Sequence, residues 1–237
     1  MIVPTPSMKE IILQWKVLNK NLFVVPTGID EKQLAGADEF AVRREYGIKD
    51  DEILLVTIAR LTKEKNMQFL FEAVAQVLKE NKKVKFLAGG GGDLTDKLKE
   101  FMLSKKIAKR VILPGLVPDE IKKNYYTAGD IFVFASKSEA QGMIISEAMY
   151  LGLPVVAIAS TGVKDLVTNQ VTGLLVHENK QDFVGAIRRL IEDKALRKKF
   201  TENAGKIARQ GYTSKICTQR LLQVYEEAIK KNKERKG

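Results

Sequence analysis

The chain has 237 residues, of which 45% are hydrophobic and 29% charged, and this composition excludes a disordered or fibrous protein. Its longest apolar runs fall far short of the roughly 20 residues that a membrane-spanning helix needs. The first ten residues lack a basic stretch followed by an apolar core, so we expect no secretory signal. The single cysteine, Cys217, excludes an internal disulfide, and no His or Cys cluster accompanies it to form a zinc site. We therefore expect a cytoplasmic protein.

The formal net charge of +11 is concentrated at one end of the chain. From Lys194 onward there are 13 Lys or Arg and 4 Asp or Glu, whereas the first 193 residues carry 27 and 25. This asymmetry indicates an anionic partner for the C-terminal part, such as an acidic membrane surface or a nucleic acid. A solvated, lysine-rich helical surface explains the same charges equally well.

Short apolar runs alternate with segments of helical period along most of the chain. Residues 1–7 are expected to be extended and to lead into a helix from residue 8, with Ser7 as its N-cap. Strands are expected at residues 21–25, 52–59, 83–88, 110–115, 130–136, 154–160 and 172–177. Helices are expected at residues 66–80, 93–105, 118–128, 143–151, 162–168, 181–193, 195–209 and 214–233.

This order predicts an α/β fold with a doubly wound, Rossmann-like parallel sheet covered by helices on both faces. The expected strands are apolar on both faces, which a doubly covered sheet requires. We expect three regions: residues 1–20 as the end of a preceding domain, 21–193 as the Rossmann-like domain, and 194–237 as basic C-terminal helices. The last helix has an apolar stripe, so it must pack on something.

The densest functional signal is SKSEAQGMIISEAMYLGLPVVA, which begins at Ser136. A strand ends there, a polar loop carries Glu139, Gly142 opens a helix, and Glu147 lies about one turn inside it. Backbone N–H groups at a helix N-terminus bind phosphate oxygens, and Gly142 leaves their approach open. The two carboxylates are suited to holding the hydroxyl groups of a sugar or a ribose. Taken alone, such a pair is more often a helix cap and a surface charge.

A second cluster is ARLTKEKN, in which Arg60 and Lys65 follow a buried strand. Ligands of open α/β sheets bind at the carboxyl ends of the strands, so cations placed there face the crevice. The rigid guanidinium and the mobile ammonium together suit a diphosphate. An exposed, charged loop is an equally good explanation of this segment alone.

Two glycine-containing turns add weaker signals. In VPTGID, Gly28 is expected to adopt a backbone conformation that only glycine tolerates. The run AGGGGD, residues 88–93, lacks the spacing of a dinucleotide-binding motif, and a tight turn explains it as well as a phosphate loop does. No Asp-x-Asp pair is present, so we expect no metal and no other cofactor, with positive side chains in their place.

The ordered motifs VPTGID, ARLTKEKN, LPGLVPDEIKKNYYTAGDIFVFAS, SEAQGMIISEAMYLGLPVVA and VTGLLV resemble the C-terminal, donor-binding half of group 1 retaining glycosyltransferases, which have the GT-B fold. The resemblance extends from about residue 21 to the C-terminus. It implies a retaining hexosyltransferase that uses a nucleotide-diphosphate sugar, with a UDP-sugar as the expected donor. It also implies an N-terminal acceptor domain that brings the catalytic histidine, so this chain alone is expected to bind the donor without transferring sugar.

The resemblance assigns roles to individual residues. It implies that Arg60 and Lys65 hold the diphosphate, that Glu139 holds the donor sugar, and that Glu147 holds the ribose. We expect Arg60, Lys65 and Glu139 to be the catalytic residues. The base is expected near Leu116 and Val117, and the remaining donor-binding residues are expected to be Gly28, Gly142, Met143 and Ile144.

The sequence departs from the family pattern in two places. Thr27 occupies a position where Asn is common, and EAQG replaces the more frequent E-x-F-G. The latter is similar to the ETQG of bacterial diacylglycerol glucosyltransferases, which implies a lipid acceptor, with a saccharide as the other choice, and a peripheral location on the inner face of the membrane.

Two other classes of function stay open on the residues alone. One is a nucleotide-binding module without activity, and the other is a basic nucleic-acid-binding protein, which is disfavoured because the tail lacks interleaved aromatic residues. The only histidine, His177, is expected to have a structural role or to lie on the surface, and Tyr125 and Tyr126 are expected in the core.

Overall fold

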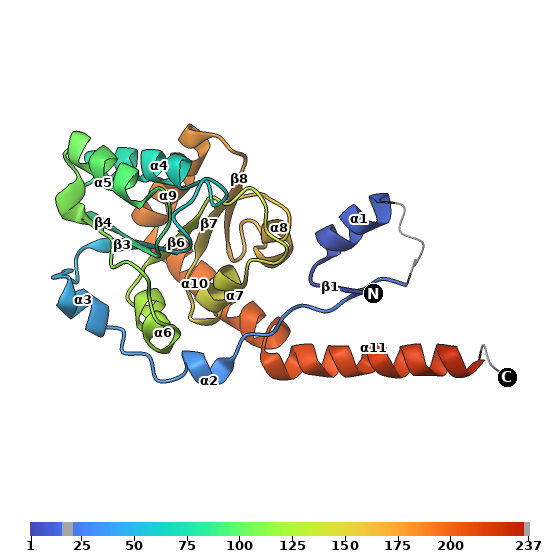
Figure 1. Cartoon of the computed structure of the whole chain (residues 1–237). Helices are drawn as coiled ribbons and strands as arrows, with labels where there is room; N and C mark the ends of the chain where they lie inside the picture. Colours follow the sequence, from blue (N-terminus) through green and yellow to red (C-terminus); the bar gives the residue numbers. More distant parts are fainter. Residues whose placement is uncertain (16–20, 235–237) are drawn as a thin grey trace.

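The computed structural model describes residues 1–15 and 21–234, and a parallel six-stranded sheet forms the centre of this part (Figure 1). In spatial order its strands are β5 (Val111–Ile112), β4 (Val84–Gly89), β3 (Ile53–Ile58), β6 (Ile131–Phe134), β7 (Val155–Ile158) and β8 (Gly173–Val176). The chain first builds outward from β3 to β5 and then places β6 on the other side of β3. The predicted doubly wound, Rossmann-like sheet is confirmed, and its topological switch point lies between β3 and β6.

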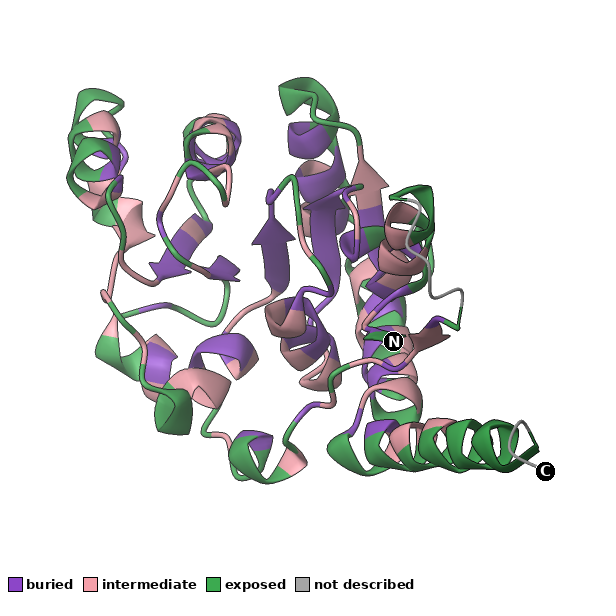
Figure 2. Ribbon diagram, turned by 45° about the vertical axis from the view of Figure 1, so that its right-hand side comes forward, coloured by how far each residue is buried: buried purple, intermediate pink, exposed green. Residues whose placement is uncertain are grey.

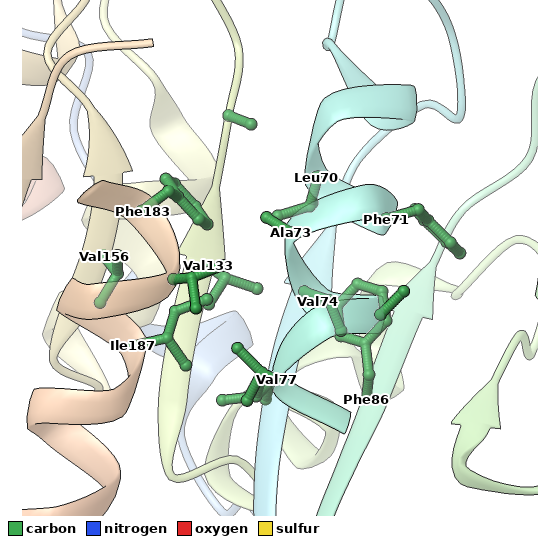
Figure 3. Close-up of a cluster of buried hydrophobic side chains, with 14 of the residues drawn as sticks. Leu70, Phe71, Ala73, Val74, Val77, Phe86, Val133, Val156, Phe183 and Ile187 are labelled. Atoms are coloured by element: carbon green, nitrogen blue, oxygen red, sulfur yellow. The ribbon is translucent and has the colours of Figure 1, made fainter. Parts of the chain in front are cut away.

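Helices α4 (Met67–Glu80), α5 (Thr95–Ser104) and α9 (Lys180–Glu192) cover one face of the sheet. Figure 3 shows side chains of α4 and α9 meeting those of β4, β6 and β7. Phe71 packs edge-on against Phe86, with ring centroids 5.2 Å apart. The almost wholly apolar strands predicted this burial, because alternate residues of each strand enter cores on opposite faces.

The opposite face is covered by α6 (Asp119–Thr127), α7 (Met143–Tyr150), α8 (Val163–Leu166) and α10 (Lys194–Gly211). Helix α10 packs closely against α7, and its Ala204 and Ala208 are fully buried in the same core as the sheet residues. Small side chains on α10 allow this close approach. The first of the basic C-terminal helices is therefore part of the body of the fold.

The N-terminal segment differs from the sequence prediction in two respects. The strand expected at residues 21–25 does not join the main sheet; β2 (Phe23–Val24) pairs in parallel with β1 (Ile2–Val3) in a separate two-stranded sheet. Thr5 caps α1 (Pro6–Gln14), because Pro6 has no N–H to donate and starts the helix, so the expected cap at Ser7 is wrong. The end of the expected helix, residues 16–18, lies outside the described residues.

Two short helices were not predicted, α2 (Glu31–Leu34) and α3 (Ala41–Glu45), together with a 3-10 turn at Ala108–Arg110. The last helix, α11 (Ser214–Glu234), extends away from the body below β1 and α1 (Figure 1), and most of its surface is exposed (Figure 2). Of its expected apolar stripe, Ile216, Leu221 and Val224 are partly buried, whereas Tyr225 and Ala228 are exposed. Only part of the stripe is covered by the described residues.

Candidate functional site

The loops that follow β3 and β6 meet at the switch point of the sheet. Lys65, from the loop after β3, places its Nζ 2.6 Å from Oε1 of Glu139, from the loop after β6. These residues are 74 positions apart in the chain. The topology therefore joins two of the clusters that the sequence singled out.

A groove of about 450 Å³ opens beside this ion pair. Six of the ten residues expected to bind the donor line it: Arg60, Lys65, Glu139, Gly142, Met143 and Ile144. The other residues around it are Pro4, Thr27, Ala59, Ala140 and Gln141. The groove lies at the carboxyl ends of β3 and β6, which is the usual ligand position in open α/β sheets.

The two cations of the groove are held by carboxylates of different burial. The Lys65 and Glu139 side chains are only 15% and 14% exposed, so their ion pair is shielded from water on most sides. Arg60 pairs with Glu64 at 2.8 Å, and these side chains are 64% and 56% exposed. Because exposed ion pairs are worth about 1 kcal/mol or less, Arg60 can turn to another anion at low cost.

The N-terminus of α7 forms one wall of the groove. Gly142 precedes the helix with φ of 87° in the left-handed region, where glycine carries no steric penalty. Met143 and Ile144 occupy the first turn, whose N–H groups have no acceptor within the helix. The wall thus presents backbone donors and the positive end of the helix dipole beside Lys65 and Arg60.

Gln141 was not singled out from the sequence, yet it joins this wall to the loop after β2. Its Oε1 accepts the N–H of Thr27 at 2.7 Å, and its Nε2 donates to the Thr27 carbonyl at 2.9 Å. The side chain is buried, so this paired contact fixes the distance between the two loops. A glutamine next to a glycine gave no indication of this partner in the sequence.

The structural reason for Gly28 differs from the expected one. Gly28 is not among the residues with positive φ, so the expected left-handed conformation is wrong. A Cβ on Gly28 would lie 2.5 Å from Cα of Ser214, at the start of α11. Glycine is required here because two backbone segments approach closely. Gly28 lines a neighbouring hollow rather than the groove with Lys65.

Glu147 lies farther along α7 and forms a second cluster with α6. Its Oε2 accepts a hydrogen bond from the Tyr126 hydroxyl at 2.8 Å and lies 3.1 Å from Nζ of Lys122. Burial and the neighbouring carboxylate raise the pKa of Tyr126, which is fully buried, so its hydroxyl stays protonated. Burial alone would lower the pKa of Lys122, but the charges of Glu147 and Asp119 raise it.

Leu116 and Val117 lie over the glycine run that follows β4. The Leu116 side chain is 84% exposed, and Val117 is partly buried. The N–H of Gly90 donates to the Gly115 carbonyl at 2.7 Å, which joins the loops after β4 and β5. The glycine run also hydrogen-bonds to the loop of Arg60, through the N–H of Leu61 and the Gly91 carbonyl. An exposed apolar platform therefore lies next to the charged loop.

Two further titratable residues, His177 and Cys217, do not line the groove. His177 is exposed at the end of β8, and Cys217 is buried, which raises the pKa of its thiol. Tyr125 and Tyr126 are buried, as predicted.

In residues 1–15 and 21–234 there is no group of three or more His, Cys, Asp or Glu that could hold a metal ion. Within the same residues, no helix combines the length and apolar character needed to span a bilayer.

Comparison with known proteins identifies the family of this chain. The model of the family "Glycosyl transferases group 1" matches residues 38–207 of the chain. The chain belongs to this family. The resemblance seen in the motifs is thereby confirmed.

Two curated relatives carry the name alpha-monoglucosyldiacylglycerol synthase. The protein from Streptococcus pneumoniae is 32% identical over 191 residues, which cover 78% of this chain and 43% of that protein. The protein from Acholeplasma laidlawii is 25% identical over 236 residues, covering 98% of this chain and 58% of that protein. The chain spans about half the length of the curated relatives it matches.

Solved structures share the fold. Anabaena HepE, determined in complex with UDP and glucose, superposes with a TM-score of 0.85 at 23% identity, over 95% of this chain and 62% of that chain. Staphylococcus aureus TarM gives a TM-score of 0.80 at 23% identity, over 94% and 43% of the two chains. Both superpositions show that this chain shares the fold of these structures, so the predicted fold class is confirmed.

Proposed function

We propose that the chain binds a nucleotide-diphosphate sugar, with a UDP-sugar as the donor, in the groove beside α7. The observation that carries this proposal is the convergence of Arg60, Lys65 and the first turn of α7 on one groove next to the Glu139 carboxylate. Cations and free amides suit a diphosphate, and a carboxylate suits sugar hydroxyl groups. Membership of the group 1 family supports this assignment.

Each part of the ligand has a counterpart in the site. The diphosphate binds Arg60, Lys65 and the amides of Met143 and Ile144, with Gly142 leaving their approach open. The sugar binds Glu139. The ribose binds Glu147, and the base packs against Leu116 and Val117, whose loop adjoins that of Arg60. Gly28 contributes indirectly, because its close contact with α11 holds the Thr27 loop in place.

The reaction that this arrangement serves is sugar transfer with retention of configuration. When the bond between the sugar and the diphosphate breaks, negative charge develops on the leaving phosphate. The helix amides already face the groove, and Arg60 and Lys65 line it and can turn from their carboxylate partners to the phosphate. Donors placed in this way lower the barrier to departure. These positive groups perform the role that a metal has in other nucleotide-sugar enzymes, so the proposal includes no metal and no other cofactor.

The acceptor enters from a domain outside this chain. We place residues 1–20 at the end of that N-terminal domain, 21–193 in the donor domain, and 194–237 in a C-terminal helical region. Within that region α10 packs on the donor domain and α11 returns toward the N-terminal domain. Its docking surfaces are the exposed faces of α1 and α11, which carry Leu13, Leu222 and Tyr225, and the neighbouring Trp15. The family resemblance implies a catalytic histidine in that domain, so this chain alone transfers no sugar.

A lipid acceptor is favoured over a saccharide by the names of two relatives, both alpha-monoglucosyldiacylglycerol synthases. The basic C-terminal helices are suited to an anionic membrane surface, which supports the proposal of a cytoplasmic protein bound peripherally to the inner face of the membrane. A nucleotide-binding module without activity is the second candidate. It predicts nucleotide binding with no sugar transfer even after the N-terminal domain is supplied.

The phosphate assignment is tested by comparing UDP with uridine. A hydrogen bond to a charged group is worth about 1.5–3 kcal/mol, so Arg60→Ala and Lys65→Ala should each weaken UDP binding roughly ten- to a hundredfold. Uridine binding should be nearly unchanged in both variants. Lys63→Ala is the matched control, because Lys63 is an exposed lysine of the same loop that does not line the groove. Equal losses for UDP and uridine would refute the assignment.

A further inference from the structure

Lys122 is a largely buried lysine on the inner side of α6. Its side chain is 15% exposed, as is that of Glu147 on the facing helix. Its Nζ lies 3.0 Å from Oδ1 of Asp119, 3.1 Å from Oε2 of Glu147, and 3.2 Å from Oε1 of Glu147. None of the sequence motifs assigned a role to it.

The hydrogen-bonding capacity of this cluster is not used up. An ammonium group has three N–H donors, of which one faces Asp119 and one is shared between the oxygens of Glu147. In the part of the chain that the structure describes, no further acceptor is within hydrogen-bond distance of Nζ. Tyr126 occupies Oε2 of Glu147, so Oε1 is the less occupied oxygen. A charged donor and a charged acceptor therefore lie side by side.

The charge of Lys122 is maintained despite its burial. Burial opposes the charged form, but Glu147 and Asp119 raise the pKa of the ammonium, so it stays protonated at neutral pH. A buried ion pair adds little to stability compared with apolar residues of similar size. The pair is better explained by a ligand that uses both charges.

We propose that Lys122 is a specificity-determining residue that contacts the ribose of the nucleotide together with Glu147. One ribose hydroxyl donates to Oε1 of Glu147 and accepts from Nζ of Lys122, so the site selects a ribonucleotide over a deoxyribonucleotide. This inference rests on the proposed function, in which Glu147 is the ribose-binding carboxylate. The alternative hypothesis is that Lys122 competes with the ribose for the Glu147 carboxylate.

The experiment compares UDP, 2′-deoxy-UDP and 3′-deoxy-UDP by isothermal titration. In the unaltered chain we expect UDP to bind at least tenfold more tightly than one of the two deoxy compounds. Lys122→Met keeps the length and apolar stem of the side chain and removes the donors. It should weaken UDP binding roughly tenfold or more. It should also bring the ribose preference, the ratio of the affinity for UDP to that for the weaker deoxy compound, close to one. Lys122→Arg, which keeps a charged donor, should retain most of that preference.

A matched control lies on the same helix. Lys123 reaches the Ala35 carbonyl on the other side of α6 and does not touch Glu147, so Lys123→Met should bind all three compounds like the unaltered chain. Thermal unfolding of each variant confirms that it is folded before titration. If Lys122→Met is unstable, the proposal is tested on Lys122→Arg, which must keep the ribose preference.

The outcomes separate this inference from the proposed function. If Lys122→Met binds UDP as tightly as the unaltered chain or more tightly, with its ribose preference intact, the lysine competes with the ribose and the inference is wrong. If Glu147→Ala loses the preference while Lys122→Met keeps it, the proposed function stands and only the role of Lys122 fails. Absence of UDP binding by the unaltered chain overturns both.

Discussion

Replacing Glu139 with glutamine should strengthen the binding of UDP. Lys65 is paired with Glu139 at 2.6 Å, so a diphosphate must draw the ammonium away from this carboxylate or share it. Glutamine keeps the shape of the side chain and removes the charge. Lys65 is then released for the phosphate, and the negative charge that opposes the ligand is lost.

The size of the effect follows from the burial of the pair. Exposed ion pairs are worth about 0.2–1 kcal/mol. The Lys65 and Glu139 side chains are only 15% and 14% exposed, which places their pair at or above the upper end of that range, at about 1 kcal/mol. This corresponds to a gain of roughly fivefold in UDP affinity. UDP-glucose should gain less or lose affinity, because Glu139 also binds its sugar.

Calorimetric titration of UDP and UDP-glucose into both proteins measures the two changes. Glu64→Gln is the comparison variant, since Glu64 is a 56% exposed carboxylate that lies 2.8 Å from Arg60 and 3.7 Å from Nζ of Lys65. It should change UDP affinity by less than about twofold, because exposed pairs contribute little. The reasoning is refuted if Glu139→Gln weakens UDP as much as UDP-glucose, which would make Glu139 a nucleotide ligand.

Three further predictions concern stability. Gly28→Ala should lower the free energy of unfolding by about 1–3 kcal/mol in urea titrations, because its Cβ would overlap the backbone at the start of α11; an unchanged midpoint would contradict this. Arg43→Ala should cost about 2–3 kcal/mol in the same assay, because it leaves the partly buried carboxylate of Asp130 without its ion pair at 2.7 Å; a loss below about 0.5 kcal/mol would count against it. Burial acts to raise the pKa of Glu52, but a backbone amide and Lys85 lower it overall. The ionised Glu52 carboxylate thus stabilises the fold above the ordinary glutamate pKa, and this stabilisation is lost as the pH falls through the lowered pKa. Glu52→Gln should therefore reduce the difference between the free energies of unfolding measured at neutral and at acidic pH.

The central sheet could be predicted from the sequence because its strands are short apolar runs whose burial does not depend on fine detail. The short elements α2 and α3 could not, because each depends on tertiary contacts. Helix α2 is held by Glu31, whose Oε2 accepts hydrogen bonds from the N–H and the hydroxyl of Ser214. Helix α3 is held by Arg43 through Asp130 and the Ala128 carbonyl. Propensity alone does not select helices of four or five residues.

The site was predictable in part. Strand ends and motif order indicated Arg60, Lys65 and Glu139, but the pairing of residues 74 positions apart is a product of the topology. Gly28 was identified correctly as a constrained position, although the constraint is a close backbone contact and not its φ. Lys122 was missed because no local pattern relates a lysine on α6 to a glutamate on α7.

Direct binding of sugar nucleotides by the unaltered chain tests the central claim most directly. UDP-glucose, GDP-glucose and ADP-glucose are titrated calorimetrically in the presence of EDTA, so that any binding is metal-independent. We predict saturable binding of UDP-glucose with one site per chain, tighter than binding of the other two, and loss of that binding in Lys65→Ala. Absence of binding by all three compounds, or binding that requires a divalent metal, would contradict the claim.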